Sequence, residues 1–464
     1  MQKATDGLVQ QWVYQIRLIF MNKIFFTIIL ILIAISTVIG QNLDTVSIEN
    51  VNIIPMTTDV VYYKQRVLFS DGKIIKIEPA TSPLTNKVSL TIDGTDKYLI
   101  PGLAEMHYHF RSNDIESDFK LLIANGITTV RNMAESDGQN HIAIRQKVRS
   151  GELLGPDYYT AGHYLKSEQL RTKEEVKAIV KTHKEKGYDF LKIADNLPKD
   201  IYLKLLEECE ANKVLMIGHA QRNLPLEFSL RMKSIEHIEE FLYLSDSNHN
   251  TFFKQSKAEL KELAQQLNSS GIYIGTTLVV FDFINNCLND EKFTAFQHND
   301  LIKYIARKER EDFLTERNDY RKIKDREFDG VKAPLLFNNY FSWMKDFARI
   351  LSDNKVSLLT GSDTYGMVIV GFSLHKEFLL LQEAGIKPYD ILLASTVNPA
   401  RYLENYSVGG TIAEGKNANM VLLNKNPLDD IQNTKLIEGV ILKGKWFDRK
   451  TLNRMLEEVE LAFK

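Results

Sequence analysis

The 464-residue chain carries 58 Lys and Arg against 60 Asp and Glu, which gives a formal net charge of −2 at pH 7. This balance gives no indication of a nucleic-acid partner, since such proteins usually carry an excess of positive charge. With 44% apolar and 25% charged residues, the composition is that of a globular protein, long enough for one large domain and a smaller one. The two cysteines, Cys209 and Cys287, are too few for a disulfide framework and are expected to be buried thiols.

An almost unbroken apolar run occupies residues 24–39, between Lys23 and the polar sequence after Gly40. This pattern predicts a secretory signal peptide within residues 1–40, with Met21 as an alternative start and a mature chain from about Gln41. The run is shorter than the roughly 20 residues that cross a bilayer as a helix, and an uncleaved membrane anchor is the alternative. We therefore expect an exported protein, in a bacterial periplasm or outside the cell.

Short alternating apolar and polar runs, broken by turn residues, mark both ends of the chain. They lie in residues 41–100 and 404–448 and are typical of hairpin strands. Two β-rich ends around a different middle predict one small β-sandwich built from both. Residues 449–464 are expected to form a C-terminal helix.

Residues 101–403 alternate short apolar strands with helical patterns, which predicts βαβ units and a parallel sheet. Eight repeats in about 300 residues indicate an α/β fold of the (β/α)8 barrel type. The strands are expected in the run that ends at His109 and at residues 128–132, 157–160, 189–194, 214–219, 234–237, 273–277 and 356–361.

A long charged stretch, residues 281–339, interrupts this repeat between the seventh and eighth strands. A solvated helix face is one interpretation of its charge. The other is that this excursion lies on the catalytic face of the barrel, covers the site and shapes substrate choice.

Two histidines one residue apart, His107 and His109, end the first expected strand. Side chains alternate in a strand, so both imidazoles point to the same face and make half of a metal site. In a barrel, the functional side chains lie at the carboxyl ends of the strands. The other polar residues expected in or just after strands are Lys192, His219, His237 and Asp363.

The chain resembles the amidohydrolase superfamily, and in particular its imidazolonepropionase-like and prolidase-like branch. The first motif is IPGLAEMHYH at residues 100–109, with Glu105 where an Asp is usual. Further matching phrases are GITTVR (126–131), SIEH (234–237), TGSD (360–363), HKEFLLLQEAG (375–385), ASTVNPA (394–400) and GGTIAEG (409–415). The likeness runs from about residue 45 to the end, and one departure is Asn417, where an Asp is usual.

The resemblance implies a binuclear metal centre, with zinc favoured by the ligand types and manganese or iron also suitable. His107 and His109 would bind the more buried ion together with Asp363, and His219 and His237 the more exposed one. Lys192 would bridge the two ions as a carbamate, because a free ammonium has no lone pair to offer. The alternative for Lys192 is an ion pair with an acid such as Asp195. His141, His163, His183, His249 and His298 are expected to be surface or loop residues.

Such a centre activates a water and polarises a scissile carbonyl, and Asp363 would transfer the proton to the leaving group. The branch implies hydrolysis of an amide bond in dipeptides or N-acyl amino acids. Arg222, Tyr164 and Arg131 are candidates for binding the substrate carboxylate, and the alternative for each is a structural salt bridge or a packing role. A metal-dependent esterase, lactonase or phosphotriesterase is one alternative, and a catalytically idle binding protein is another. The expected partner is a small-molecule substrate, with the oligomeric state left open.

Overall fold

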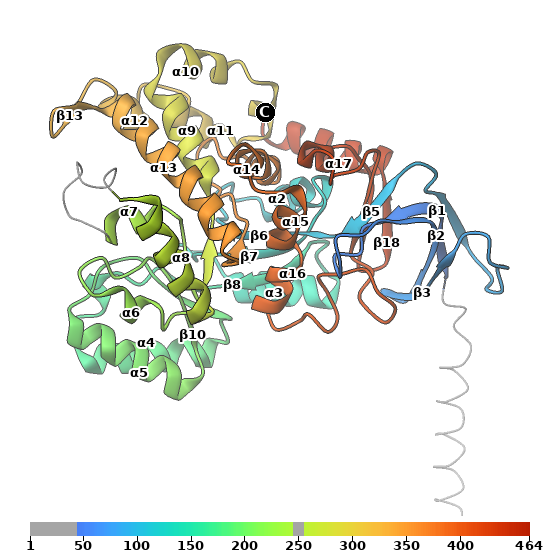
Figure 1. The fold of residues 1–464 in the computed structure, drawn as a ribbon, viewed down its shortest axis with the longest axis horizontal. Coiled ribbons are helices and arrows are strands. Elements are labelled where there is room, and N and C mark those ends of the chain that lie inside the picture. Colours follow the sequence, from blue (N-terminus) through green and yellow to red (C-terminus); the bar gives the residue numbers. More distant parts are fainter. Residues whose placement is uncertain (1–43, 245–254) are drawn as a thin grey trace, which may run out of the picture.

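The structure is a computed structural model that describes residues 44–244 and 255–464. The predicted signal peptide lies outside these residues. Figure 1 shows a helix-covered body, which contains the barrel, beside a smaller β-domain in which the blue N-terminal strands lie next to the red strand β18. Within the described residues, no helix has both the length and the apolar character needed to cross a membrane.

Eight parallel strands build the predicted barrel in two arcs, and seven of them begin within one residue of their predicted start. Backbone hydrogen bonds close both seams between the arcs: Met106 N donates to Thr360 O (3.0 Å) and Leu165 N to Lys192 O (3.1 Å). The arcs are β6 (Leu103–Tyr108), β7 (Ile127–Asn132) and β8 (Asp157–Thr160), and β9 (Phe190–Ile193), β10 (Leu215–Gly218), β11 (Ser234–Ile235), β12 (Tyr273–Gly275) and β15 (Ser357–Leu359).

Helices follow the barrel strands, as a (β/α)8 fold requires. Their ends carry local signals: at the start of α4, Thr172 and Glu175 form a capping box, and Gly187 ends the helix with a φ of 77°. The α-helices of the barrel region outside the insertion are α2 (Ile115–Ala124), α3 (His141–Ser150), α4 (Lys173–Lys186), α5 (Lys199–Asn212), α6 (Leu226–Ser229), α7 (Glu240–Leu244), α8 (Lys257–Ser270), α14 (Phe372–Glu383), α15 (Pro388–Ser395) and α16 (Val397–Tyr402).

The predicted insertion between β12 and β15 is mostly helical. Its contacts reach the loop after β15: the Glu309 carboxylate accepts a hydrogen bond from Gly366 N (3.0 Å), and the hydroxyls of Tyr320 and Tyr365 lie 3.2 Å apart. A role in substrate choice stays a prediction. The elements are α9 (Leu278–Leu288), α10 (Asp290–Gln297), η3 (Asp300–Tyr304), α11 (Arg307–Phe313), α12 (Asp319–Ile323), β13 (Glu327–Phe328), β14 (Val331–Lys332) and α13 (Ala333–Asp353).

Strands from both chain ends form one eight-stranded sheet, in the order β18-β17-β16-β5-β1-β2-β3 with β4 also paired to β1. Lys73 bridges to Asn417, so the sheet curls into two layers around an apolar core that contains Ile48, Phe69 and Ile441. The predicted sandwich is therefore a single curled sheet. Its strands are β1 (Val46–Ile53), β2 (Tyr62–Ser70), β3 (Lys73–Pro79), β4 (Leu90–Asp93), β5 (Tyr98–Pro101), β16 (Met420–Leu423), β17 (Ile437–Leu442) and β18 (Lys445–Asp448).

The C-terminal helix α17 (Arg449–Ala462) forms where the sequence predicts it. It packs against α2 of the barrel, and the ion pair between Lys120 and Glu458 (3.0 Å) joins the two helices. Both cysteines are buried free thiols, as expected.

Candidate metal centre

The carboxyl ends of the barrel strands bring together all six residues that the sequence proposes as metal ligands. His107 and His109 lie at the end of β6, and Lys192 lies in β9. The remaining three follow β10, β11 and β15 and are His219, His237 and Asp363. The rings of His107 and His237 have centroids 4.5 Å apart, and those of His219 and His237 lie 5.1 Å apart. The six residues thus form one cluster at the barrel mouth.

His107, His109 and Asp363 form the tightest part of this cluster, because one ligand atom of each lies within 4.8 Å of the others. Asp363 Oδ1 is 3.1 Å from His109 Nε2 and 3.5 Å from His107 Nε2. Two imidazole nitrogens and a carboxylate oxygen suit zinc and similar divalent ions. These three residues could hold one ion by themselves.

The loop after β15 is fixed against β6, and this fixes Asp363 beside the histidines. Asp363 N donates to His107 O (2.7 Å), and His109 N donates to Thr364 Oγ1 (2.8 Å). Gly361 permits the close approach, since a Cβ at this position would lie 2.5 Å from the Cβ of His107. Asp363 has a φ of 53°, a left-handed conformation that non-glycine residues rarely adopt and that is often found at functional sites.

The histidines are oriented by hydrogen bonds at Nδ1. His219 Nδ1 lies 2.7 Å from Glu240 Oε1, His237 Nδ1 lies 2.8 Å from Thr277 Oγ1, and His107 Nδ1 lies 3.2 Å from Glu236 Oε2. In each ring this leaves Nε2 as the nitrogen that can bind a cation. Carboxylates that hold a ligand histidine in this way are a regular feature of metal sites.

Arg131, one of the candidates for binding the substrate carboxylate, lies beneath the cluster, where its contacts are those of a structural residue. Its side chain is fully buried, and it donates to Glu236 Oε2 (2.8 Å), to Met106 O (2.7 Å) and to the hydroxyl of Tyr402 (2.6 Å). A buried cation needs such partners, because an unpaired charge in the interior costs several kcal/mol. Arg131 therefore positions Glu236, which in turn orients His107.

Lys192 is buried at the centre of the cluster, with its Nζ 3.2 Å from His107 Nε2. The alternative partner, Asp195, instead accepts hydrogen bonds from the backbone N and Oγ of Ser167. Burial lowers the pKa of Lys192 to about 8. At pH 7 about a tenth of this side chain is therefore the neutral amine, far more than for an ordinary lysine.

The protonation states of the cluster suit cation binding. Burial lowers the pKa of His107 to about 3 and that of His237 well below its usual value, so both rings are neutral with a lone pair available. Burial opposes ionisation of Asp363, but the neighbouring His107 and His109 hold its pKa well below its usual range. The cluster thus presents neutral imidazoles and an ionised carboxylate.

A cavity of about 230 Å³ opens beside this cluster and is lined by residues that include His109, Arg111, Tyr164, Asp363 and Tyr365. The Tyr164 hydroxyl lies 3.1 Å from His109 Nε2, so Tyr164 remains a candidate for substrate binding. Arg111 is half exposed and pairs with Glu309 of the insertion at 3.3 Å.

Arg222 lies at another side of the barrel mouth and is partly exposed. Its Nε and Nη2 donate to Glu240, and its guanidinium lies over the ring of Tyr243 at 3.9 Å from the centroid. Since Glu240 also holds His219, Arg222 supports the metal cluster. Nη1 has no partner among the described residues, and the residue therefore remains a candidate for binding a carboxylate.

Two of the other histidines contradict the prediction that they lie on the surface or in loops. His141 in α3 and His183 in α4 are buried. Each packs on a neighbouring aromatic ring, Tyr158 and Tyr188 respectively, and this long-range contact is invisible in the helical pattern. His163 and His298 are at least partly exposed, and His249 lies outside the described residues.

The sequence prediction missed the residues that support the ligands. Glu236 precedes His237 directly, and Glu240 follows it by three positions, so their proximity in sequence was a usable signal. Thr277 is the last residue of an expected strand and Arg111 comes two residues after another, but nothing in the local pattern distinguishes them from ordinary residues at strand ends. Their roles follow from contacts across the barrel.

Comparison with known proteins agrees with this architecture. A dihydroorotase from Streptococcus pneumoniae is 41% identical over 76 residues, which are 15% of this chain and only 17% of the dihydroorotase. The structure of a Xaa-Pro dipeptidase with methionine bound in its active site superposes with a TM-score of 0.65 at 17% identity, over 87% of this chain and all of that one. The bottromycin amidohydrolase gives 0.69 at 20% identity over 90% of both chains.

At these identities the superpositions show the fold alone, which is that of a TIM barrel. The amidohydrolase family model matches residues 98–447, most of the chain and all of the proposed ligands. The chain belongs to the amidohydrolase family, a family of metal-dependent hydrolases that act on carbon–nitrogen bonds.

Proposed function

We propose that this chain is an exported hydrolase of amide or peptide bonds that uses two divalent ions, with dipeptides or N-acyl amino acids as substrates. The observation that carries the proposal is the cluster of imidazole and carboxylate donors around a buried lysine at the mouth of an amidohydrolase barrel. The apolar run of residues 24–39 supports export.

The donors fit two ions. His107, His109 and Asp363 would hold one, His219 and His237 the other, and a carbamate on Lys192 would bridge them. Nitrogen and oxygen ligands without a thiolate favour zinc. When bound, the ions supply Lewis-acid activation of a water molecule and polarise the scissile carbonyl.

The environment of Lys192 favours carbamate formation. Its neutral amine attacks the carbon of CO₂, a new N–C bond forms, and the nitrogen releases one proton to solvent. The product carries one negative charge on two oxygens, which suits a position between cations far better than an ammonium does. The lowered pKa of Lys192 raises the fraction of amine that can react.

Asp363 is the proposed proton carrier. Its ionised carboxylate faces the cluster, where it accepts a proton from the attacking water and returns it to the leaving nitrogen. Arg222, Arg111 and Tyr164 lie around the mouth and supply two cations and a hydroxyl for a substrate carboxylate. Two of the structurally similar proteins are named as a Xaa-Pro dipeptidase and a bottromycin amidohydrolase. These names support the proposal that the substrate of this chain contains an amide or peptide bond.

The test is the metal content per chain of the protein from Gln41 onward, measured by elemental analysis after reconstitution with zinc and bicarbonate. About two ions are expected in the wild type, and about one or none in Lys192→Ala. Lys199→Ala, at the exposed start of α5, is the matched control and is expected to keep both. No bound ion in the wild type would contradict the proposal, and one ion unaffected by Lys192→Ala would reject the bridging carbamate.

The same preparations decide the reaction. Activity is measured on dipeptides, N-acyl amino acids, a cyclic amide such as dihydroorotate, and simple esters. Hydrolysis of the first two groups is expected, with loss of activity in Asp363→Asn. Hydrolysis confined to esters would replace the proposal with an esterase. Mass spectrometry of the N-terminus after expression with the full leader tests export, since cleavage is expected near Gln41.

A further inference from the structure

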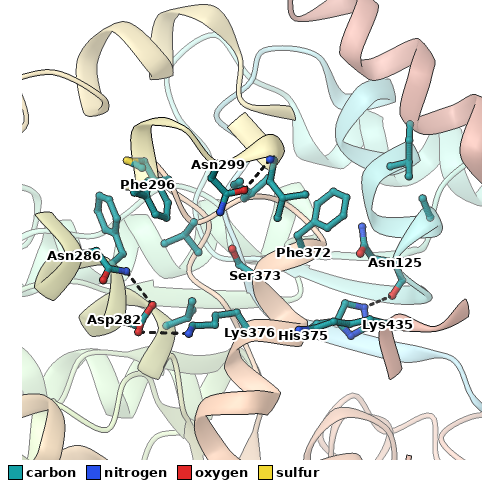
Figure 2. Close-up of a pocket in the computed structure, with 18 of the residues that line it drawn as sticks. Asn125, Asp282, Asn286, Phe296, Asn299, Phe372, Ser373, His375, Lys376 and Lys435 are labelled. Carbon is teal, nitrogen blue, oxygen red and sulfur yellow. Dashed lines mark hydrogen bonds and ion pairs between the residues drawn. The ribbon is translucent and has the colours of Figure 1, made fainter. Parts of the chain in front are cut away.

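A second, larger cavity lies away from the metal cluster, between α9, the α10–η3 segment, α14, α17 and the end of α2. Its volume is about 560 Å³, within the range of small-molecule sites. Figure 2 shows Phe296 and Phe372 on one side and Lys376, His375 and Lys435 along the other. None of the six proposed metal ligands lines this cavity.

Apolar side chains from several segments form much of its wall, among them Phe283, Phe296, Leu301, Met367 and Phe372. The rings of Phe283 and Phe296 pack with centroids 6.4 Å apart. Such a wall favours a ligand with an apolar hydrocarbon part, because a ligand that lies against the wall removes aromatic and aliphatic surface from water.

The polar part of the wall carries an excess of positive charge: Lys376, Lys435 and Arg449 against the single carboxylate of Asp282. Asp282 pairs with Lys376 at 3.6 Å and accepts a hydrogen bond from Asn286. Among the residues that line the cavity, one carboxylate thus faces three cations, and it pairs with one of them. Outside the lining, Asp430 acts on Lys435 and Glu438 acts on Arg449 through their charges.

The other two cations, Lys435 and Arg449, have hydrogen-bond donors without a protein partner. Across residues 44–244 and 255–464, the Nζ of Lys435 has no hydrogen bond or ion pair; partial burial and the charge of Lys376 lower its pKa, and the charge of Asp430 opposes this shift. Arg449 Nη1 donates to Ile437 O (3.2 Å), but its Nε is buried without a partner in the described part of the chain. Its Nη2 has no hydrogen-bond partner in the described residues either, so the guanidinium keeps an uncommitted donor beside the cavity.

His375 is not part of this excess charge. Its Nδ1 lies 2.9 Å from Thr434 Oγ1 and its Nε2 lies 3.0 Å from Asn125 O, and burial lowers its pKa to about 4. The ring is neutral and fully engaged, which leaves Lys435 and Arg449 as the anion-binding groups.

We propose that this cavity is a binding site for an amphipathic monocarboxylate, whose hydrocarbon body lies against the phenylalanine wall and whose carboxylate binds Lys435 and Arg449. A monoanion suits the site because few donors are uncommitted, whereas a phosphate dianion would need more. The wall is also continuous with the barrel mouth: Phe283 packs edge-on against Tyr365, two residues after Asp363. The proposal does not depend on the reaction proposed above.

The test is isothermal titration calorimetry of the full protein with decanoate below its micelle concentration. Decan-1-ol supplies the body without the charge, and acetate supplies the charge without the body. Saturable binding of decanoate is expected, at least about tenfold tighter than that of either partial ligand.

Two variants locate the site. Lys435→Glu removes the cation, and Leu456→Trp on α17 fills part of the cavity from a partly buried position. Each is expected to weaken decanoate binding about tenfold or more. Lys425→Glu makes the same charge change at an exposed position outside the cavity and is expected to bind as the wild type does. The proposal is overturned if the wild type does not bind decanoate, if the partial ligands bind equally well, or if both cavity variants keep the wild-type affinity.

Discussion

Replacing Glu236 by Gln tests how much the negative charge of this residue, which lies beneath the metal cluster, contributes to the stability of the protein. Glu236 is fully buried and accepts from Arg131 (2.8 Å), Ser234 (2.6 Å) and His107 (3.2 Å). The amide keeps the volume but removes the only carboxylate that the structure pairs with the Arg131 side chain in the described residues. An uncompensated buried charge costs about 3–5 kcal/mol, so the free energy of unfolding is expected to fall by about that amount.

The assay is urea unfolding of metal-free protein followed by circular dichroism, so that lost metal affinity does not contribute. Glu207→Gln, which removes an exposed carboxylate paired with Lys204, is the control and is expected to leave the midpoint unchanged. The double variant Arg131→Met/Glu236→Gln removes both charges and is expected to recover about 1–3 kcal/mol relative to the sum of the single changes. A wild-type midpoint for Glu236→Gln, or strict additivity in the double variant, would refute the reasoning.

Three further predictions concern pH, packing and substrate binding. Burial raises the pKa of Glu377 to about 7, so the native state favours its protonated form and loses stability as pH rises from about 4.5 to 7. The melting temperature of Glu377→Gln minus that of the wild type is therefore expected to increase as the pH rises over this range. A difference that does not change with pH would contradict this. Gly361→Ala places a methyl group 2.5 Å from the Cβ of His107 and is expected to cost about 1–3 kcal/mol in urea unfolding and to reduce bound metal. Gly409→Ala, with contacts no closer than 3.7 Å, serves as its control. Arg222→Met is expected to raise KM about tenfold for a dipeptide but not for its C-terminal amide, and an equal effect on both would show that Arg222 only supports Glu240.

The sequence determined much of the architecture because its signals are local. Period-two runs that end in polar residues located the barrel strands, and the H-x-H spacing placed His107 and His109 on one face. The quoted family phrases contain four residues of the cluster, His107, His109, His237 and Asp363, and the expected strands added Lys192 and His219. The strands of both chain ends were also recognisable, but their closure into one curled sheet was not, since it rests on a bridge between residues as distant as Lys73 and Asn417.

Only the tertiary structure decided the partners of the polar side chains. Arg131 was a candidate for substrate binding from the sequence. The residues around an arginine in a strand do not show whether its guanidinium reaches the open end of the barrel or stays in the barrel interior. Glu236 is 105 residues away in sequence, and its contact exists only once the strands close. The same holds for the buried His141 and for the second cavity, whose wall comes from six separate segments. Periodicity specifies which face of an element is buried, whereas the neighbour that a buried polar group meets there is chosen by the packing of the whole chain.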